Sequence, residues 1–320
     1  MKRWFSLGLV VVLAILAGSC GFDGQEGATP TATAPPLYQG QLAFNSNRDG
    51  HYEIFLVNSD GTGLRQLTDG GRGERNAPAW SPDGTRIAYY VQTRALYMAI
   101  PEDIMILLVD DPRGEHERIT HTPPIVDRDP AWSPRGQTIA YCSDFALMAC
   151  DVDGSNPRVL RDDHRYYMPA WSPNGDRIAV GVQLSDDDWG IYVMNVKDAL
   201  QGTDGSNPIR ITQGTDSHWD PAWSPDGTTI LFANHVDHQI HAVPAPPPEG
   251  FEKLPQTTPL TTVGVNTEPA WSPDGTTIAY THTEGRNRDI WVMYKDGAGA
   301  RPVTHDQAEA EDVAPAWKPR

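Results

Sequence analysis

The sequence predicts an all-β fold, a six-bladed β-propeller, and three observations support this prediction. The tripeptide Pro-Ala-Trp recurs at intervals of 39 to 52 residues, which is typical of solenoids and propellers. Its 29 glycines and 28 prolines are spread along the chain, as many short strands and tight turns require. The first and last repeats are incomplete in complementary ways, which allows a closed ring. The six tryptophans of the tripeptide are Trp80, Trp132, Trp171, Trp223, Trp271 and Trp317.

The first residues of the chain predict a secretory leader, residues 1–19. Met-Lys-Arg is followed by an apolar run from Leu7 to Leu16 and by Ala17-Gly18-Ser19-Cys20. A basic start, a short apolar segment and small residues before a cleavage site are typical of a signal peptide. Small residues before a cysteine resemble a bacterial lipobox, although Ala17 stands where that motif most often has Leu. The resemblance implies lipid attachment at Cys20; an ordinary signal peptide with an incidental cysteine is the alternative.

Residues 20–37 predict a flexible, lipid-anchored tether. They are rich in Gly, Thr, Ala and Pro, a composition that cannot bury a core. The lipid would then be the only attachment to the cell membrane or outer membrane, and the domain of residues 38–320 would be extracytoplasmic.

Each repeat predicts a blade of four strands, A to D. Pro-Ala-Trp forms the inner strand A, and Ser81-Pro82-Asp83-Gly84 matches a type I turn with Gly at the fourth place. Strand B follows, as at 87–90, and strand C is clearest at 53–57, 190–194 and 289–293. An Asp-Gly hairpin then leads to strand D, a short run before a Thr.

The ends of the chain predict how the ring closes. The chain enters at a B strand near Leu42 and ends three residues after Trp317, so the first blade lacks its A strand. Placing the last Pro-Ala-Trp in the first blade pairs both open edges, and unpaired strand edges favour aggregation. One tryptophan per blade at the same position indicates packing between blades rather than a ligand-stacking platform.

The run Pro-Ala-Trp-Ser-Pro-Asp-Gly followed by Ile-Ala-Tyr, at 78–89 and 269–280, resembles the WD40-like repeat of the TolB-like propeller family. The resemblance covers residues 38–320. It implies an extracytoplasmic scaffold that binds a protein or a small ligand through one mouth of the ring. TolB has a further domain before its propeller, where we expect only the tether. Related propellers precede the catalytic domain of prolyl oligopeptidase-type peptidases, for which we expect no counterpart, since no Gly-x-Ser-x-Gly motif occurs.

The charge of the chain makes some classes of binding partner unfavourable. The formal net charge is −17, and an acidic surface repels nucleic-acid phosphates and anionic lipid headgroups. We therefore expect no nucleic-acid partner and, in addition, a monomer without a cofactor.

The candidate binding face carries the D-to-A and B-to-C connections, which are the variable ones. The D-to-A loops are expected at 69–77, 121–129, 162–168, 213–220, 263–268 and 305–314. Arginine and aromatic residues are enriched at binding hot spots, and a solvated rim is the alternative. The candidate residues are Arg72, Arg75, Arg128, His164, Arg165, Tyr166, Tyr167, His218, Trp219 and Asp220.

Four further features leave alternatives open. The apolar run 96–100 is either a partner-contacting patch or part of a folded hairpin. The spacing of His235, His238 and His241 makes them weak zinc candidates, and the acidic run 186–188 could bind calcium or form a solvated loop tip. Matching the third blade to the first places Cys142 and Cys150 on opposite faces, whereas a shifted hairpin would allow a disulfide.

These observations favour a non-catalytic binding or scaffold protein, and no catalytic residue is assigned. An enzyme, a carbohydrate lyase or hydrolase with its site in the same mouth, is the alternative. It would need convergent acids, bases or a metal around the axis. A sensor domain that acts through a partner is a third reading.

Overall fold

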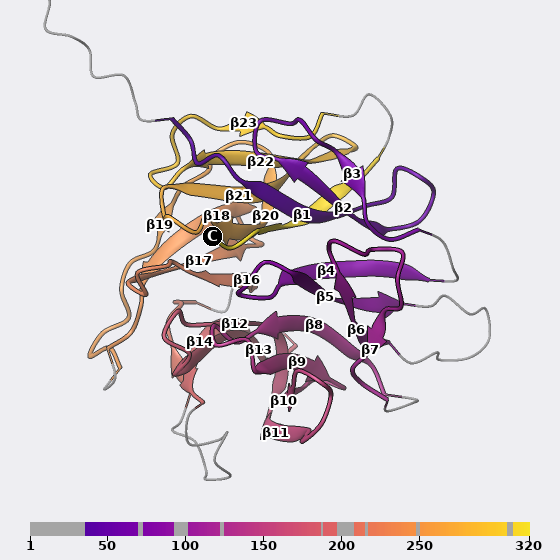
Figure 1. Cartoon of the computed structure of the whole chain (residues 1–320). Coiled ribbons are helices and arrows are strands. Elements are labelled where there is room, and N and C mark those ends of the chain that lie inside the picture. Colours follow the sequence, from indigo (N-terminus) through magenta and orange to yellow (C-terminus); the bar gives the residue numbers. More distant parts are fainter. Residues whose placement is uncertain are drawn as a thin grey trace, which may run out of the picture. The chain divides into compact units, whose positions relative to one another are not determined.

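The computed structural model describes residues 36–69, 73–92, 102–121, 125–186, 188–196, 208–214, 217–247, 250–305 and 310–320. In that part of the chain, six four-stranded antiparallel sheets follow one another around a ring in sequence order (Figure 1). The predicted leader and Cys20 lie outside the described residues. Within the described ranges there is no long apolar helix that could cross a bilayer.

Each sheet is one blade with strands A to D in order. The first three blades are β24 (Asp312–Trp317), β1 (Gln41–Ser46), β2 (Glu53–Asn58) and β3 (Arg65–Gln66); β4 (Glu74–Trp80), β5 (Arg86–Gln92), β6 (Asp103–Leu108) and β7 (Glu117–Arg118); and β8 (Asp127–Trp132), β9 (Thr138–Ser143), β10 (Ala146–Asp151) and β11 (Arg158–Arg161). The last three are β12 (Arg165–Trp171), β13 (Arg177–Ser185), β14 (Asp188–Asn195) and β15 (Ile209–Arg210); β16 (His218–Trp223), β17 (Thr229–Asn234), β18 (Gln239–Pro244) and β19 (Thr258–Pro259); and β20 (Val265–Trp271), β21 (Thr277–Glu284), β22 (Asn287–Tyr294) and β23 (Arg301–Pro302).

The C-terminal strand closes the ring, as the sequence predicts. β24 pairs antiparallel with β1, with Leu42 opposite Trp317 and Ala43 opposite Ala316. The amide of Lys318 also donates to the carbonyl of Gln41 at 2.8 Å. The first blade is therefore built from both ends of the described chain.

The Ser-Pro-Asp-Gly turns are structural, as the sequence indicates. The amide of Gly84 donates to the carbonyl of Ser81 at 2.8 Å, and Gly84 has a φ of 66°. The hydroxyl of Ser81 donates to Asp83 at 2.6 Å, and this bond is the main cause that lowers the pKa of Asp83 to about 2. The Asp83 carboxylate therefore accepts its hydrogen bond within its own turn.

The tryptophans of Pro-Ala-Trp take part in packing between blades. Trp80 donates its indole N–H to the carbonyl of Ala316, and Trp171 donates to the carbonyl of Ala131, both at 3.1 Å. Trp317 donates to the carbonyl of Ala270 at 3.2 Å. In each case the acceptor belongs to the Pro-Ala-Trp of the preceding blade, which confirms the core interpretation.

The core lies between the blades rather than at one centre. One apolar cluster joins Ile54 and Leu56 of the first blade to Ile87 and Tyr89 of the second.

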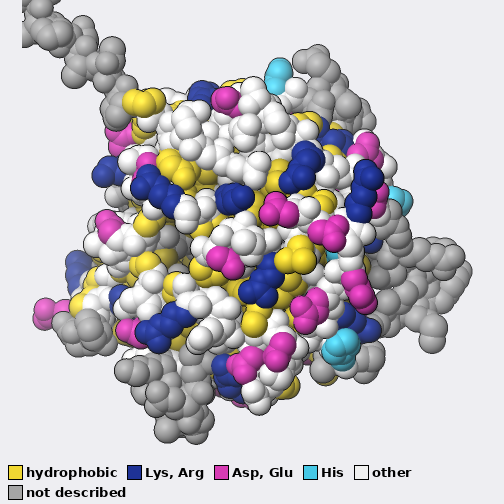
Figure 2. Space-filling model, in the orientation of Figure 1, with side chains coloured by type: hydrophobic (Ala, Val, Ile, Leu, Met, Phe, Trp, Pro, Cys, Tyr) yellow, Lys and Arg dark blue, Asp and Glu magenta, His cyan; other side chains and the backbone are white. Residues whose placement is uncertain are grey.

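On the molecular surface, both signs of charge are interspersed on the face that Figure 2 shows.

The two cysteines of the third blade do not form the disulfide that a shifted hairpin would have allowed. Cys142 packs in one interblade cluster and Cys150 in another, so the two thiols lie on opposite faces of the same sheet, and both are free. Burial raises the pKa of the Cys150 thiol to about 12.

Candidate functional site

The inner strands begin earlier than predicted. The prediction started strand A at the proline, because Pro-Ala-Trp is the short apolar segment of the repeat. The structure instead carries each strand across a bulge at that point; in β12 the register shifts between Tyr167 and Ala170. Eight of the ten candidates that were expected in loops therefore lie in A strands. His164 lies in a connection, and Arg72 is outside the described residues. Those in A strands are Arg75, Arg128, Arg165, Tyr166, Tyr167, His218, Trp219 and Asp220.

The residue before each proline lies at this bulge in all six inner strands. Its φ is between 49° and 56°, a left-handed conformation that is uncommon for residues other than glycine. Such backbone outliers cluster at functional sites. These six residues and the prolines after them line an axial cavity of about 410 Å³. The six are Ala77, Asp129, Met168, Asp220, Glu268 and Ala314.

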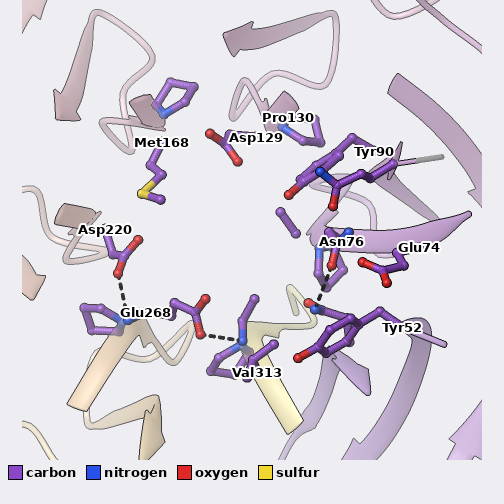
Figure 3. Close-up of a pocket in the computed structure, with 18 of the residues that line it drawn as sticks. Tyr52, Glu74, Asn76, Tyr90, Asp129, Pro130, Met168, Asp220, Glu268 and Val313 are labelled. Atoms are coloured by element: carbon purple, nitrogen blue, oxygen red, sulfur yellow. Dashed lines mark hydrogen bonds between the residues drawn. The ribbon is translucent and has the colours of Figure 1, made fainter. Parts of the chain in front are cut away.

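Three of the six positions carry carboxylates, which face the cavity in Figure 3. The carboxylate of Asp220 accepts a hydrogen bond from the amide of Glu268 at 3.1 Å. The carboxylate of Glu268 accepts one from the amide of Ala314 at 2.9 Å and one from the hydroxyl of Thr281 at 2.6 Å. Each of these two side chains therefore joins its own bulge to the bulge of the next blade.

Burial controls the protonation of two of these acids. It raises the pKa of Asp129 to about 6, and the Arg128 guanidinium opposes that rise. Burial also raises the pKa of Asp220 well above its usual range, with the negative charge of Glu268 as the next cause. Both carboxyl groups stay half-buried and line the cavity. The floor of the cavity can therefore gain or lose protons near neutral pH.

The upper wall of the cavity comes from the loop-bearing face of the ring. Arg288 lines the cavity, and its guanidinium is 3.0 Å from the carboxylate of Glu311, which also accepts a hydrogen bond from the hydroxyl of Tyr52. The amide nitrogen of Asn45 donates to the side-chain oxygen of Asn76 at 3.3 Å. The wall is thus polar, and it already contains one neutralised cation.

An aromatic cluster lies beside the mouth of this cavity. Tyr167 and Trp219 directly precede Met168 and Asp220, and their ring centroids are 5.4 Å apart. Trp189 of β14 lies 5.0 Å from Tyr167 and 4.2 Å from Trp219. All three rings are half-buried. At the ends of the cluster are two exposed rings, Phe145 at 5.6 Å from Tyr167 and His235 at 5.6 Å from Trp219.

Two other candidates are buried. Tyr166 is 0% exposed and His218 is 3% exposed. Side chains alternate between the two faces of a strand, so each packs inward while its neighbour, Tyr167 or Trp219, reaches the cluster. Tyr166 nevertheless lines a small pocket with Phe145 and Tyr167. The assignment of Tyr166 and His218 to the binding face stays a prediction.

Three arginine candidates have local partners. Arg75 pairs with Glu53 at 3.2 Å, and Arg128 lies 3.7 Å from Glu102. Arg165 stacks over the ring of Phe145 at 4.9 Å, beside the exposed His164.

Two of the three weak zinc candidates have other contacts. His241 pairs with Asp237 at 2.7 Å, while His235 belongs to the aromatic cluster. Asp188 pairs with Arg210 at 2.9 Å. Among the residues that the structure describes, no three His, Cys, Asp or Glu side chains form a group that could hold a metal. Asp187 and the apolar run 96–100 lie outside the described residues.

Sequence reasoning found Asp220 but missed Asp129 and Glu268. A signal was present, because all three directly precede Pro-Ala-Trp and therefore share one position in the repeat. The inward direction of that position follows only from the bulge.

The chain is similar to TolB proteins and to other propellers. It matches no protein-family model. It is 29% identical over 147 residues to a TolB homologue of Chlorobium luteolum, covering 45% of this chain and 31% of that protein. It is 28% identical over 193 residues to the uncharacterised peptidase YuxL of Bacillus subtilis, covering 50% of this chain and 29% of that protein. The chain thus spans about a third or less of the length of these relatives.

Solved structures show the same fold. TolB from Acinetobacter baumannii superposes with a TM-score of 0.68 at 18% identity, covering 88% of this chain and 67% of that one. An oligogalacturonate lyase in complex with manganese gives a TM-score of 0.56 at 16% identity, covering 84% of this chain and 75% of that one.

Proposed function

We propose that this chain, a TolB-like six-bladed propeller, is a non-catalytic binding or scaffold protein of the cell envelope, tethered through a lipid at Cys20. Its loop-bearing mouth would hold a protein or a small ligand. The observation that carries this proposal is the axial cavity of about 410 Å³, to which all six blades contribute and beside which the aromatic cluster lies.

The cavity and the cluster have the properties of a recognition surface. Ligand sites in proteins are mostly preformed concave pockets of roughly 300–1,000 Å³ with a few placed polar groups. Tyrosine and tryptophan are enriched among the residues that dominate binding energy. A rigid scaffold with variable connections at one face is a common arrangement for binding.

Crosslinking in the cell tests this proposal. We expect photoreactive residues at Phe145 and His235, which are exposed beside the cluster, to capture the same partner. The same chemistry at Arg135 and Lys295, which are exposed in turns of the opposite face, should capture no such partner. The crosslinked products are identified by mass spectrometry.

Two results separate the variants of the proposal from its failure. If no protein is captured but a sugar or an ion raises the melting temperature, the ligand is small. Equal capture of one partner from both faces would contradict the assignment of binding to the loop-bearing mouth.

An enzyme at the same mouth is the second candidate, and the raised pKa values of Asp129 and Asp220 favour it. Perturbed acids are frequent at catalytic sites. Cleavage of a polysaccharide by the purified chain, lost in the Asp220→Asn variant, would support this candidate over the first.

A further inference from the structure

We propose that the axial cavity binds a single cationic group, an ammonium or a guanidinium, against the carboxylates of its floor. This inference rests on the proposed function, because it uses the same mouth. It specifies the chemistry of the ligand there.

The charges of the lining are unbalanced. Among the described residues, four carboxylates line the cavity, those of Glu74, Asp129, Asp220 and Glu268, against one cation, Arg288. Arg288 is already paired with Glu311, whose carboxylate is outside the lining. The carboxylates at the bulges, Asp129, Asp220 and Glu268, form no ion pair with any residue that the structure describes. Once deprotonated, these carboxylates therefore offer negative charge that no ion pair among the described residues neutralises.

A second observation in the wall points to the same kind of ligand. Asn45 lines the cavity and is 3% exposed, and its side-chain oxygen has no hydrogen-bond partner among the described residues. A buried acceptor without a donor is unfavourable. A ligand with several N–H donors would satisfy it together with the carboxylates.

The geometry suits one cationic head rather than an extended charged surface. The carboxylates at the bulges come from different blades at the same position of the repeat, so they surround the axis (Figure 3). A guanidinium has five N–H donors and an ammonium three, and neither accepts hydrogen bonds. Charge-assisted hydrogen bonds of this kind are stronger than neutral ones. The cation could belong to a free small molecule or to a lysine or arginine side chain of a protein partner.

Binding of a cation is coupled to proton release. The charges of Glu268, Asp129 and Arg288 act on the pKa of Asp220. Those of Arg128, Glu102 and Glu268 act on the pKa of Asp129. Burial keeps the protonated form of each acid favourable above its usual pH range. A bound cation favours the carboxylate and lowers both pKa values. The affinity for a cation should therefore rise with pH through the raised pKa values, and it should fall as the acids become protonated.

Calorimetric titration of the full chain tests the inference. The probes are arginine amide and citrulline amide, both acetylated at the α-amine; the citrulline compound has nearly the same shape without the charge. We expect citrulline amide to bind at least about tenfold more weakly at pH 8. The Asp220→Asn variant keeps an acceptor for the Glu268 amide, so it should fold. It should bind arginine amide about tenfold more weakly, with a flatter pH dependence.

Matched variants and a peptide complete the experiment. Glu252→Gln removes an exposed carboxylate of the opposite face, and it should bind arginine amide like the parent chain. The tripeptide Gly-Arg-Gly, acetylated and amidated so that only its side chain is charged, distinguishes the sources. Much tighter binding than arginine amide indicates a side chain of a protein partner, and equal binding indicates a free cation.

The inference is overturned if the charged and the neutral amide bind equally, or do not bind, or if Asp220→Asn leaves the affinity unchanged. Its failure is distinguishable from that of the proposed function. Capture of a partner at Phe145 and His235 without any preference for charge would remove the cation site and leave the binding role intact.

Discussion

Replacing Arg48 by methionine is expected to lower the free energy of unfolding by about 3–5 kcal/mol, the usual consequence of leaving one buried charge without its partner. The guanidinium of Arg48 donates to both carboxylate oxygens of Asp312 at 2.9 Å. The Asp312 side chain is 1% exposed beside Arg48, so the variant leaves a carboxylate in a largely buried position. Methionine keeps much of the apolar stem that packs near Phe55.

The double variant Arg48→Met/Asp312→Leu controls for the loss of packing. Removing both charges avoids an isolated buried carboxylate, so we expect this variant to recover most of the stability. Denaturant unfolding measures all three chains. Equal stability of the single and the double variant would show that the ion pair does not hold the C-terminal strand.

Trp317→Ala is the second change with a large expected effect, a loss of about 3–5 kcal/mol, as for other large side chains removed from a core. Trp317 is 6% exposed and packs in a cluster with Leu42 and Phe44, with Tyr38 at 5.3 Å between ring centroids. Its indole N–H also joins the first blade to the last.

Trp317→Phe separates the ring from its hydrogen bond. It keeps an aromatic side chain in the cluster and loses the donor to Ala270, so a loss of about 1 kcal/mol is expected. Thermal and denaturant unfolding give both values. If Trp317→Ala lowered the free energy of unfolding by less than Trp317→Phe does, the end of the chain would contribute little to the fold.

The architecture could be predicted because its signals are local and repeated. Pro-Ala-Trp sets the inner strand, Ser-Pro-Asp-Gly sets the turn after it, and a missing A strand at one end matches a spare one at the other. The beginning of strand A could not be predicted in the same way. A proline normally marks the end of a strand. The bulges at Asp129 and Glu268 have a left-handed backbone without a glycine, so the sequence does not indicate them.

The site was only partly predictable because it is assembled from distant residues. Tyr167, Trp189 and Trp219 were brought together by the stacking of two blades, and no spacing along the chain predicts that contact. Tyr167 and Trp219 were nevertheless among the candidates, since aromatic residues near variable connections favour binding. The axial carboxylates depend on the ring as a whole, because only closure directs all six bulges to one cavity.

Hydrogen exchange of the intact chain tests that closure most directly. If the C-terminal strand completes the first blade, the amides of Val313, Ala316 and Trp317 exchange as slowly as those of Leu42 to Phe44, with which they share a sheet. Fast exchange of residues 313–317, as in a free tail, while the strands of the other blades stay protected, would contradict the closed ring and the axial cavity that depends on it.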